Sequence, residues 1–222
     1  MLTKRLGIIV PSSNSVMEID FYHNLPRDIT LHVTRMYLDD TAVTGEEEML
    51  NVHFPKALTE LETAMPDAVV LGYSPKATLG GDYELELCRR INEVAKCPSV
   101  GVLAGVRKAV EKRQMQRLAV VSPYIDELNQ GIKATLEANN IQVVGIYGLG
   151  LDRPDSIAMI EPAEIYRFAK EKVRNLYVDG LYLACTNLRA MEVHKELQED
   201  LGLPVITSNQ AVFEAALELL QA

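Results

Sequence analysis

The sequence predicts an α/β protein whose parallel sheets are flanked by helices and divided into two similar lobes. Short apolar runs rich in β-forming residues recur along the 222 residues, and longer segments with helical spacing separate most of them. This alternation favours parallel sheets, because the connection between two parallel strands is usually a helix. No low-complexity linker interrupts the chain.

The strands are expected at the apolar runs. In chain order these are Leu6–Val10, Ile29–Thr34, Ala68–Leu71, Ser99–Leu103, Leu118–Val121, Val143–Tyr147, Leu181–Ala184 and Val205–Thr207. Helical spacing of apolar residues is clearest in Tyr83–Ala95, Ile125–Ala138, Ala163–Leu176 and Met191–Leu201. Gly202 follows the last of these helices and Pro204 opens the next strand, as expected for a helix stop and a strand start.

Composition and charge narrow the class of protein. Hydrophobic residues make up 48% of the chain and charged residues 24%, which is typical of a globular protein. The formal net charge of −9 argues against a nucleic-acid partner, because phosphate binding needs a basic face. The apolar runs are too short to span a membrane, and residues 1–5 lead straight into a strand without a signal peptide. A cytoplasmic protein without a membrane partner is expected.

The three cysteines, Cys88, Cys97 and Cys185, are odd in number and match no zinc-binding spacing. This favours a reducing compartment. Cys88 lies on an expected helix and Cys97 precedes a strand, so both are expected to be small buried apolar side chains.

Neither histidines nor acidic residues indicate a metal site. The four histidines contain no ligand pair such as H-E-x-x-H. The acidic residues Asp39, Asp40 and Glu46–Glu48 are expected to form a solvated loop and helix face. No metal and no cofactor are therefore expected.

A weak internal repeat supports the two lobes. Residues Asp67–Ser74 parallel Asp179–Thr186, since each has an acidic turn, an apolar strand and then a hydroxyl residue in a loop. The expected lobes are residues 1–104 with 208–222, and residues 105–207. Ligands of open α/β folds bind at the carboxyl ends of strands. Tyr73 and Cys185 are thus expected to face each other across a substrate in the cleft between the lobes.

Two Ser-Asn motifs follow the first and the last strand. Ser12, Ser13 and Asn14 offer hydroxyl, amide and backbone donors at a helix start, which suits an anion. Ser208 and Asn209 repeat the theme after the last strand. For both motifs a plain helix N-cap is the alternative. No G-x-G-x-x-G dinucleotide motif follows any strand.

The loop Gly72–Gly81 is rich in hydroxyls and glycines. Ser74 and Thr78 offer donors for a carboxylate, and Lys76 offers a positive charge. The G-K-[ST] ending of a P-loop is absent, and an ordinary strand-to-helix turn is the alternative.

Two further segments follow strands. In Ser122–Asn129, Pro123 suits a first helical turn, Ser122 suits a cap, and the hydroxyl of Tyr124 is placed at the mouth of the sheet. Cys185 ends a strand and is expected to open a helix, whose N-terminus lowers the pKa of a thiol. Such a thiol can exchange a proton near neutral pH. A buried structural cysteine is the alternative.

Taken together, these motifs resemble the maleate isomerase and arylmalonate decarboxylase branch of the Asp/Glu racemase superfamily. The resemblance rests on Val10–Asn14, Ser122–Asn129, Cys185–Arg189 and Ser208–Ala211, which occur in this order over nearly the whole chain. It implies two similar α/β lobes with the active site between them.

The resemblance also compares the cysteines. Racemases and maleate isomerases of this superfamily use one cysteine from each lobe. The internal repeat and Gly80–Gly81 put Tyr73 at the position of the first cysteine, and Cys185 matches the second. A phenol with a pKa near 10 is a poor substitute for a thiol base.

Arylmalonate decarboxylase keeps only the second cysteine, which protonates the enediolate left after carbon dioxide departs. By this resemblance Cys185 donates the proton, and Ser74, Tyr124 and the N–H of Thr186 hold the carboxylate. Pro75 departs from the decarboxylase pattern, because it brings neither a hydroxyl nor an N–H. Asn14 resembles the carboxylate-binding asparagine of the isomerases.

The first hypothesis is therefore a cofactor-independent decarboxylase of a substituted malonate. The alternatives are cis–trans isomerisation of maleate or a related diacid, and a carboxylate-binding protein without catalysis. The partner is a small carboxylate, and a homo-oligomer is compatible with the sequence. The expected catalytic residues are Cys185, Tyr124 and Ser74, and the expected substrate-binding residues are Ser13, Asn14, Tyr73, Thr186, Asn187, Ser208 and Asn209.

Overall fold

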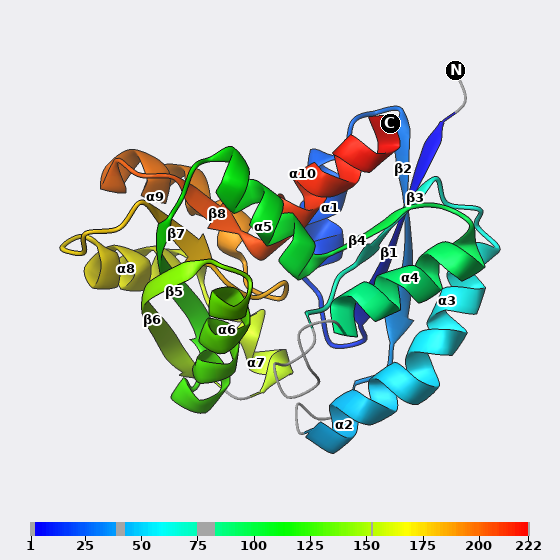
Figure 1. Ribbon diagram of the computed structural model, residues 1–222, viewed down its shortest axis with the longest axis horizontal. Helices are drawn as coiled ribbons and strands as arrows, with labels where there is room; N and C mark the ends of the chain where they lie inside the picture. The colour runs from blue at the N-terminus through cyan, green and yellow to red at the C-terminus, as the bar shows by residue number, and fades with distance from the viewer. Residues whose placement is uncertain (1–2, 39–42, 75–82, 152, 222) are drawn as a thin grey trace.

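The computed structural model describes residues 3–38, 43–74, 83–151 and 153–221. It has two four-stranded parallel sheets, each flanked by helices, as the sequence predicts (Figure 1). Within the described residues no helix is long and apolar enough to cross a bilayer. The same residues contain no group of three or more His, Cys, Asp or Glu side chains placed to hold a metal ion.

The first lobe contains the sheet with strand order β2-β1-β3-β4. Its strands are β1 (Lys4–Pro11), β2 (Ile29–Met36), β3 (Ala68–Leu71) and β4 (Ser99–Gly101). Its helices are α1 (Met17–Asn24), α2 (Val43–Glu48), the π-helical segment η1 (Met49–His53), α3 (Phe54–Glu62) and α4 (Tyr83–Ala95). The side chains of β3 are all buried, which explains why its sequence is a continuous apolar run.

The second lobe contains the sheet with strand order β6-β5-β7-β8. Its strands are β5 (Arg117–Tyr124), β6 (Gln142–Leu151), β7 (Gly180–Leu183) and β8 (Val205–Thr207). Its helices are α6 (Asp126–Ala138), α7 (Pro154–Ile157), α8 (Pro162–Val173), the 3-10 segment η3 (Ala190–Glu192) and α9 (His194–Leu201). Gly202 ends α9 in the left-handed conformation at φ +63°, as its position after the helix predicts.

Helices α5 (Val102–Lys112) and α10 (Ser208–Gln221) pack against each other (Figure 1). They approach closely at Gly105, where an added Cβ would lie 2.7 Å from the Cα of Val212. Helix α10 also packs against β3 and β4 of the first sheet. The division into residues 1–104 with 208–222, and 105–207, stays a prediction.

The internal repeat corresponds to equivalent backbone contacts in the two lobes. At the start of β3, the backbone N–H of Arg5 donates to Asp67 Oδ2 at 2.7 Å. At the start of β7, the backbone N–H of Arg117 donates to Asp179 Oδ2 at 3.0 Å. The two acidic turns thus fix their strands in the same way.

The repeat also holds at the other end of these strands. The N–H of Gly72 donates to the carbonyl of Ile9, and the N–H of Ala184 donates to the carbonyl of Val121, each at 2.8 Å. The next residues, Tyr73 and Cys185, therefore occupy equivalent positions after β3 and β7.

Most expected boundaries shift by one to four residues in the structure, and three differences change the type or the start of an element. The strand expected at Ser99–Leu103 ends at Gly101, because α5 already begins at Val102 and its free N–H groups are accepted by the buried carboxylate of Glu84. Pro123 and Tyr124 belong to β5, not to a first helical turn, and α6 begins at Asp126. The helix expected from Met191 is the short η3 followed by α9.

Candidate active site

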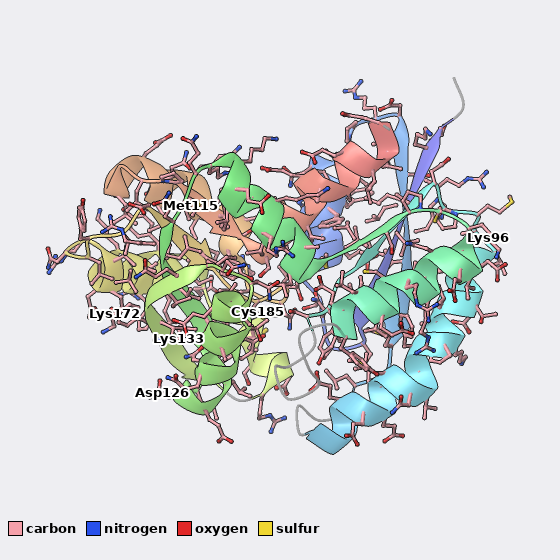
Figure 2. The ribbon with its side chains drawn as sticks, viewed as in Figure 1. Lys96, Met115, Asp126, Lys133, Lys172 and Cys185 are labelled. Carbon is pink, nitrogen blue, oxygen red and sulfur yellow. The ribbon has the colours of Figure 1, made fainter. Side chains whose placement is uncertain are left out.

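The carboxyl ends of the central strands of the two sheets meet between the lobes. Two contacts join them directly. The hydroxyl of Thr186, after β7, donates to the carbonyl of Gly72, after β3, at 3.4 Å. Asn14, after β1, donates from Nδ2 to the same hydroxyl at 2.9 Å. Figure 2 shows Cys185 in this region between the lobes. The candidate site thus lies at the strand ends, where ligands of open α/β folds bind.

Cys185 has a strained backbone. Its φ of +117° lies in a region that L-residues rarely adopt, and such a conformation costs about 1–3 kcal/mol. The backbone N–H of Cys185 donates to the buried hydroxyl of Ser208 at 3.0 Å, which helps to hold the turn. The surroundings therefore fix the direction of the thiol. No helix begins at Cys185, so the expectation that it opens a helix is wrong.

Two donors face the Cys185 sulfur. The backbone N–H of Asn187 lies 3.3 Å from Sγ, and the hydroxyl of Tyr124 hydrogen-bonds the thiol. Burial nevertheless raises the pKa of the Cys185 thiol above its ordinary value, because removing water disfavours the thiolate. Tyr124 and the backbone N–H groups of Asn187 and Leu188 oppose that rise. The expected lowering of the pKa by a helix N-terminus is wrong.

Tyr124 stays a phenol over the working pH range. Burial, and then the adjacent Cys185, raise the pKa of Tyr124 well above its ordinary value. Its neighbour Ser122 is buried and does not cap a helix. The Ser122 hydroxyl donates to Asn129 Oδ1 and accepts from the N–H of Tyr124 at 3.1 Å. Ser122 thus supports the end of β5, which carries Tyr124.

Asn14 is both a helix cap and a contact between the lobes. Its Oδ1 accepts from the N–H groups of Val16 at 3.1 Å and Met17 at 3.0 Å, at the start of α1. Its Nδ2 donates to Thr186, which leaves one further N–H on that nitrogen. The cap expected as an alternative is therefore present.

Asn187 ties the Cys185 loop to the first lobe. Its Oδ1 accepts from the N–H of Ser15 at 2.9 Å, and its Nδ2 donates to the carbonyl of Ser13 at 3.4 Å. The side chain is buried. Its carboxamide is thus engaged by the protein on both sides.

Ser208 and Asn209, at the start of α10, are also engaged. The Ser208 hydroxyl shares a hydrogen bond with the hydroxyl of Tyr182 at 2.8 Å, besides accepting from Cys185. Asn209 Nδ2 donates to Asp20 Oδ2 at 2.7 Å and to the carbonyl of Thr186 at 3.0 Å. The cap of α10 comes from Thr207, whose hydroxyl accepts from the N–H of Gln210 at 3.0 Å.

Some donors beside Cys185 are left for a ligand. Over the described part of the chain, the N–H of Thr186 and the hydroxyl of Ser13 have no hydrogen-bond partner. The Asn14 Nδ2, which donates one hydrogen to the Thr186 hydroxyl, has a second N–H that is a further donor. A set of unpaired N–H and O–H groups suits the oxygen atoms of a carboxylate.

Tyr73, at the position equivalent to Cys185, is turned toward α2. Its hydroxyl donates to Oε1 of Glu46, a carboxylate that is only 2% exposed. Glu46 is therefore not part of a solvated face, as the sequence suggested, whereas Glu47 and Glu48 are exposed. The expectation failed because the fold places one side of α2 against the first lobe.

The loop after Tyr73 is only partly described. Ser74 is exposed. Pro75, Lys76, Thr78, Gly80 and Gly81 lie outside the described residues, as do Asp39 and Asp40. Cys88 and Cys97 are half-buried against the core of the first lobe, where burial raises the pKa of each thiol to about 11.

Sequence reasoning missed two charged residues close to the site. Arg35, at the end of β2, donates from Nη1 to the carbonyl of Asn14 at 2.6 Å and to that of Ser12 at 3.4 Å. Asp20, on α1, is buried and bonded to Asn209. Neither lies in a motif. Arg35 directly follows the expected strand Ile29–Thr34, whereas only the folded arrangement brings Asp20 to the strand ends.

The chain is similar to proteins of one group. The profile of the arylmalonate decarboxylase family matches residues 6–222. An arylmalonate decarboxylase from Bordetella bronchiseptica is 22% identical over 98% of this chain and 90% of its own length. A maleate isomerase from Nocardia farcinica is 23% identical over 94% of this chain and 86% of its own length.

Solved structures of proteins from the same group superpose on this fold. A maleate isomerase from Pseudomonas putida S16, solved with maleate, superposes with a TM-score of 0.90 at 21% identity. That alignment covers 98% of this chain and 92% of the isomerase. The two-lobed architecture expected from the sequence is thereby confirmed.

Proposed function

Because the chain belongs to the arylmalonate decarboxylase family, we propose that it decarboxylates a substituted malonate without a cofactor. Cys185 is the proton donor. Tyr124 supports its thiol, and Ser13, Asn14, Ser74 and the N–H of Thr186 hold the carboxylate oxygens. The observation that carries the proposal is a half-buried thiol at the strand ends, with two donors on its sulfur and a pKa that loss of water raises.

The reaction needs little beyond these groups. The bond between the α-carbon and one carboxylate breaks, carbon dioxide leaves, and the electron pair remains as an enediolate on the rest of the molecule. The unpaired donors beside Cys185 stabilise the oxygen atoms on which that charge builds. Cys185 then gives its proton to the α-carbon and becomes a thiolate, which regains a proton from water.

The pKa shift favours a proton donor over a nucleophile. A thiol whose pKa is raised by burial is protonated at neutral pH, as the last step of decarboxylation requires. Attack on a double bond would need the thiolate, which the same burial disfavours. Hydrogen bonds from Tyr124 and from the N–H of Asn187 lower the cost of forming the thiolate after the proton has left.

The position opposite Cys185 also favours decarboxylation. Cys88 and Cys97 lie against the core of the first lobe, and Tyr73 occupies the position equivalent to Cys185. The Tyr73 hydroxyl is occupied by Glu46. A single thiol suffices to protonate an enediolate on one face, whereas two-base chemistry needs an acid or base on each face.

The proposal is tested by proton NMR in deuterated buffer with phenylmalonate, methylmalonate, maleate and both enantiomers of aspartate. We expect loss of carbon dioxide from a malonate, with deuterium at the former malonate carbon. Silence across the whole panel would count against decarboxylation of these substrates and favour a carboxylate-binding protein, which ligand-induced thermal stabilisation would reveal.

The role of Cys185 is tested by substitution. Cys185→Ala should reduce turnover at least about a hundredfold, because a positioned proton donor contributes a factor of that order. Cys88→Ala is the matched control, since Cys88 lies on α4 against the core of the first lobe. Unchanged turnover in Cys185→Ala, with an unchanged circular dichroism spectrum, would remove Cys185 from the mechanism.

Isomerisation of maleate or a related cis-diacid is the second candidate. It is favoured by the close superposition on maleate isomerases, one of which was solved with a covalently bound succinylcysteine intermediate. For this chain it predicts fumarate from maleate and an adduct on Cys185 in mass spectra of the trapped protein. Absence of both fumarate and the adduct would count against isomerisation and favour decarboxylation.

A further inference from the structure

We infer that Asp20 and Asn209 are positioning residues that act on the Cys185 thiol through the peptide group between Thr186 and Asn187. The importance of this inference for catalysis rests on the proposed role of Cys185 as the proton donor. Its test measures the thiol itself and needs no substrate.

An unbroken path of hydrogen bonds carries the inference. Asn209 Nδ2 donates to Asp20 Oδ2 at 2.7 Å and to the carbonyl of Thr186 at 3.0 Å. That carbonyl and the N–H of Asn187 belong to the same peptide group, and the N–H lies 3.3 Å from Cys185 Sγ. A donor on the carbonyl polarises the peptide group and makes its N–H a better donor to the sulfur.

The Asp20–Asn209 end of the path is shielded from water, and its end at Thr186 and Cys185 is half-buried. Asp20 is 9% exposed and Asn209 is 1% exposed. In such surroundings hydrogen bonds are stronger than in water. A change of charge on Asp20 therefore changes the electrostatic energy of the groups at the other end of the path. Asn209 Oδ1 is buried without a partner in the part of the chain that the structure describes, so this carboxamide is held by its two Nδ2 contacts alone.

Three elements meet in this path. Asp20 comes from α1, Asn209 from the first turn of α10, and Thr186 from the loop after β7. The strained backbone of Cys185 adjoins the last of these. Asn209 thus connects the first lobe and α10 to the loop that aims the thiol. A role in binding substrate would instead leave the Nδ2 hydrogens free.

Asp20 can change its charge near neutral pH. Burial raises the pKa of Asp20 to about 6, while the hydrogen bond from Asn209 opposes the rise. The charged groups that face it are His23 on its own helix, with Glu192 on η3 and Arg189 just before it. Glu192 raises the pKa, and His23 and Arg189 lower it.

The sign of the effect on the thiol follows from the charge. An ionised Asp20 pulls on one hydrogen of Asn209 Nδ2 and weakens the other as a donor to Thr186. The N–H of Asn187 then stabilises the thiolate less. Ionisation of Asp20 should therefore keep Cys185 protonated above pH 6 and make it slower to alkylate than the pH alone would give.

The test is the rate of iodoacetamide alkylation of Cys185 between pH 5 and 9, followed by mass spectrometry of its peptide. The wild-type rate should rise less steeply with pH near pH 6 than on either side of it. Asp20→Asn keeps an acceptor for Asn209 and removes the charge, so it should abolish that inflection and raise the rate at pH 8 about threefold. Asp28→Asn, an exposed carboxylate of the same lobe, is the control and should leave the profile unchanged.

Asn209→Leu breaks the path, and it should also remove the inflection. A wild-type profile without an inflection near pH 6, or one that Asp20→Asn leaves in place, would overturn the inference. If the profiles behave as expected but no malonate is decarboxylated, the positioning path stands and the proposed function fails.

Discussion

At the scale of single residues, burial decides the chemistry of Cys185. The thiol sits at a strand end with two donors on its sulfur, yet loss of water raises its pKa above the ordinary value. The order of these effects matters, because desolvation is the largest and opposes the hydrogen bonds. The result is a thiol that stays protonated at neutral pH, as the proposed proton donor must.

This shift sets the pH dependence of turnover. Because the pKa of the Cys185 thiol is raised in the folded protein, the donor form is fully present at neutral pH and is lost only as the pH rises through that raised value. Above the titration of Asp20 near pH 6, turnover should thus stay level from pH 7 to pH 8 and fall on an alkaline limb above the ordinary thiol pKa of about 8.5. A loss of turnover centred near pH 7 would contradict a raised thiol pKa.

Tyr124→Phe tests the hydroxyl on the sulfur. The variant keeps the ring and removes a hydrogen bond that stabilises the thiolate formed after proton transfer. A bond to a charged group of this kind is worth about 1.5 kcal/mol, so kcat should fall about tenfold and the alkaline limb should move to higher pH. Tyr177→Phe is the control, since that side chain is 81% exposed. Equal kinetics in both variants would exclude a role for the Tyr124 hydroxyl.

At the scale of elements, the contact between α5 and α10 holds two site residues in place. Helix α10 begins with Ser208 and Asn209, which bond the Cys185 loop. The helices approach so closely at Gly105 that a Cβ there would meet the backbone of Val212. The packing of two helices thus sets the position of the loop that carries the thiol.

Gly105→Ala should separate these helices. Alanine normally improves a helix interior by about 1 kcal/mol over glycine, but overpacking against a backbone costs about 1–3 kcal/mol. We expect a lower Tm in thermal unfolding and an altered rate of Cys185 alkylation, because α10 has to move. Lys108→Ala, an exposed position on α5, serves as the control. A higher Tm in Gly105→Ala would show that α5 and α10 accommodate the added methyl group without loss of stability.

At the scale of the whole molecule, two copies of one strand arrangement face each other, and the copies carry different residues at the key position. The acidic turns Asp67 and Asp179 make the same backbone contacts, and the strand ends beyond them pair alike. One copy then presents Cys185 and the other Tyr73, which is bonded to Glu46. The difference between the lobes is therefore chemical, because the backbone is repeated.

The buried carboxyl of Asp20 makes the free energy of unfolding depend on pH. Its pKa of about 6 in the folded protein exceeds the ordinary value, so the folded state binds its proton more tightly than the unfolded state. That contribution is complete below the ordinary value of 3.8, is mostly present at pH 4, and is lost as the pH rises through about 6. Asp20→Asn should therefore be more stable than the wild type at pH 8, by up to about 3 kcal/mol, and equally stable at pH 4. Urea unfolding at the two pH values measures this difference, and an equal difference at both would contradict it.

The sequence by itself determined the class of fold, and it predicted a candidate site at the strand ends. Buried strands of parallel sheets read as apolar runs, so Ala68–Leu71 and Val205–Thr207 match the structure at both ends. The repeat fixed the equivalence of Tyr73 and Cys185, because equal strands place equal positions at the strand ends. The donors of Asn14 and Thr186 were found in the same way, since their motifs follow strands directly.

Only the tertiary structure decided the electrostatics of the site and the partners of its polar groups. The direction of the Cys185 pKa shift depends on how much water the fold removes, and no local pattern contains that quantity. Asp20 bonds Asn209, and Glu46 bonds Tyr73, which lies far from it along the chain, as Asn209 does from Asp20. No sequence motif predicts either pair. The helices that carry these carboxylates bury their apolar faces against the rest of the fold. This long-range packing also places the carboxylates of the same helices at the strand ends.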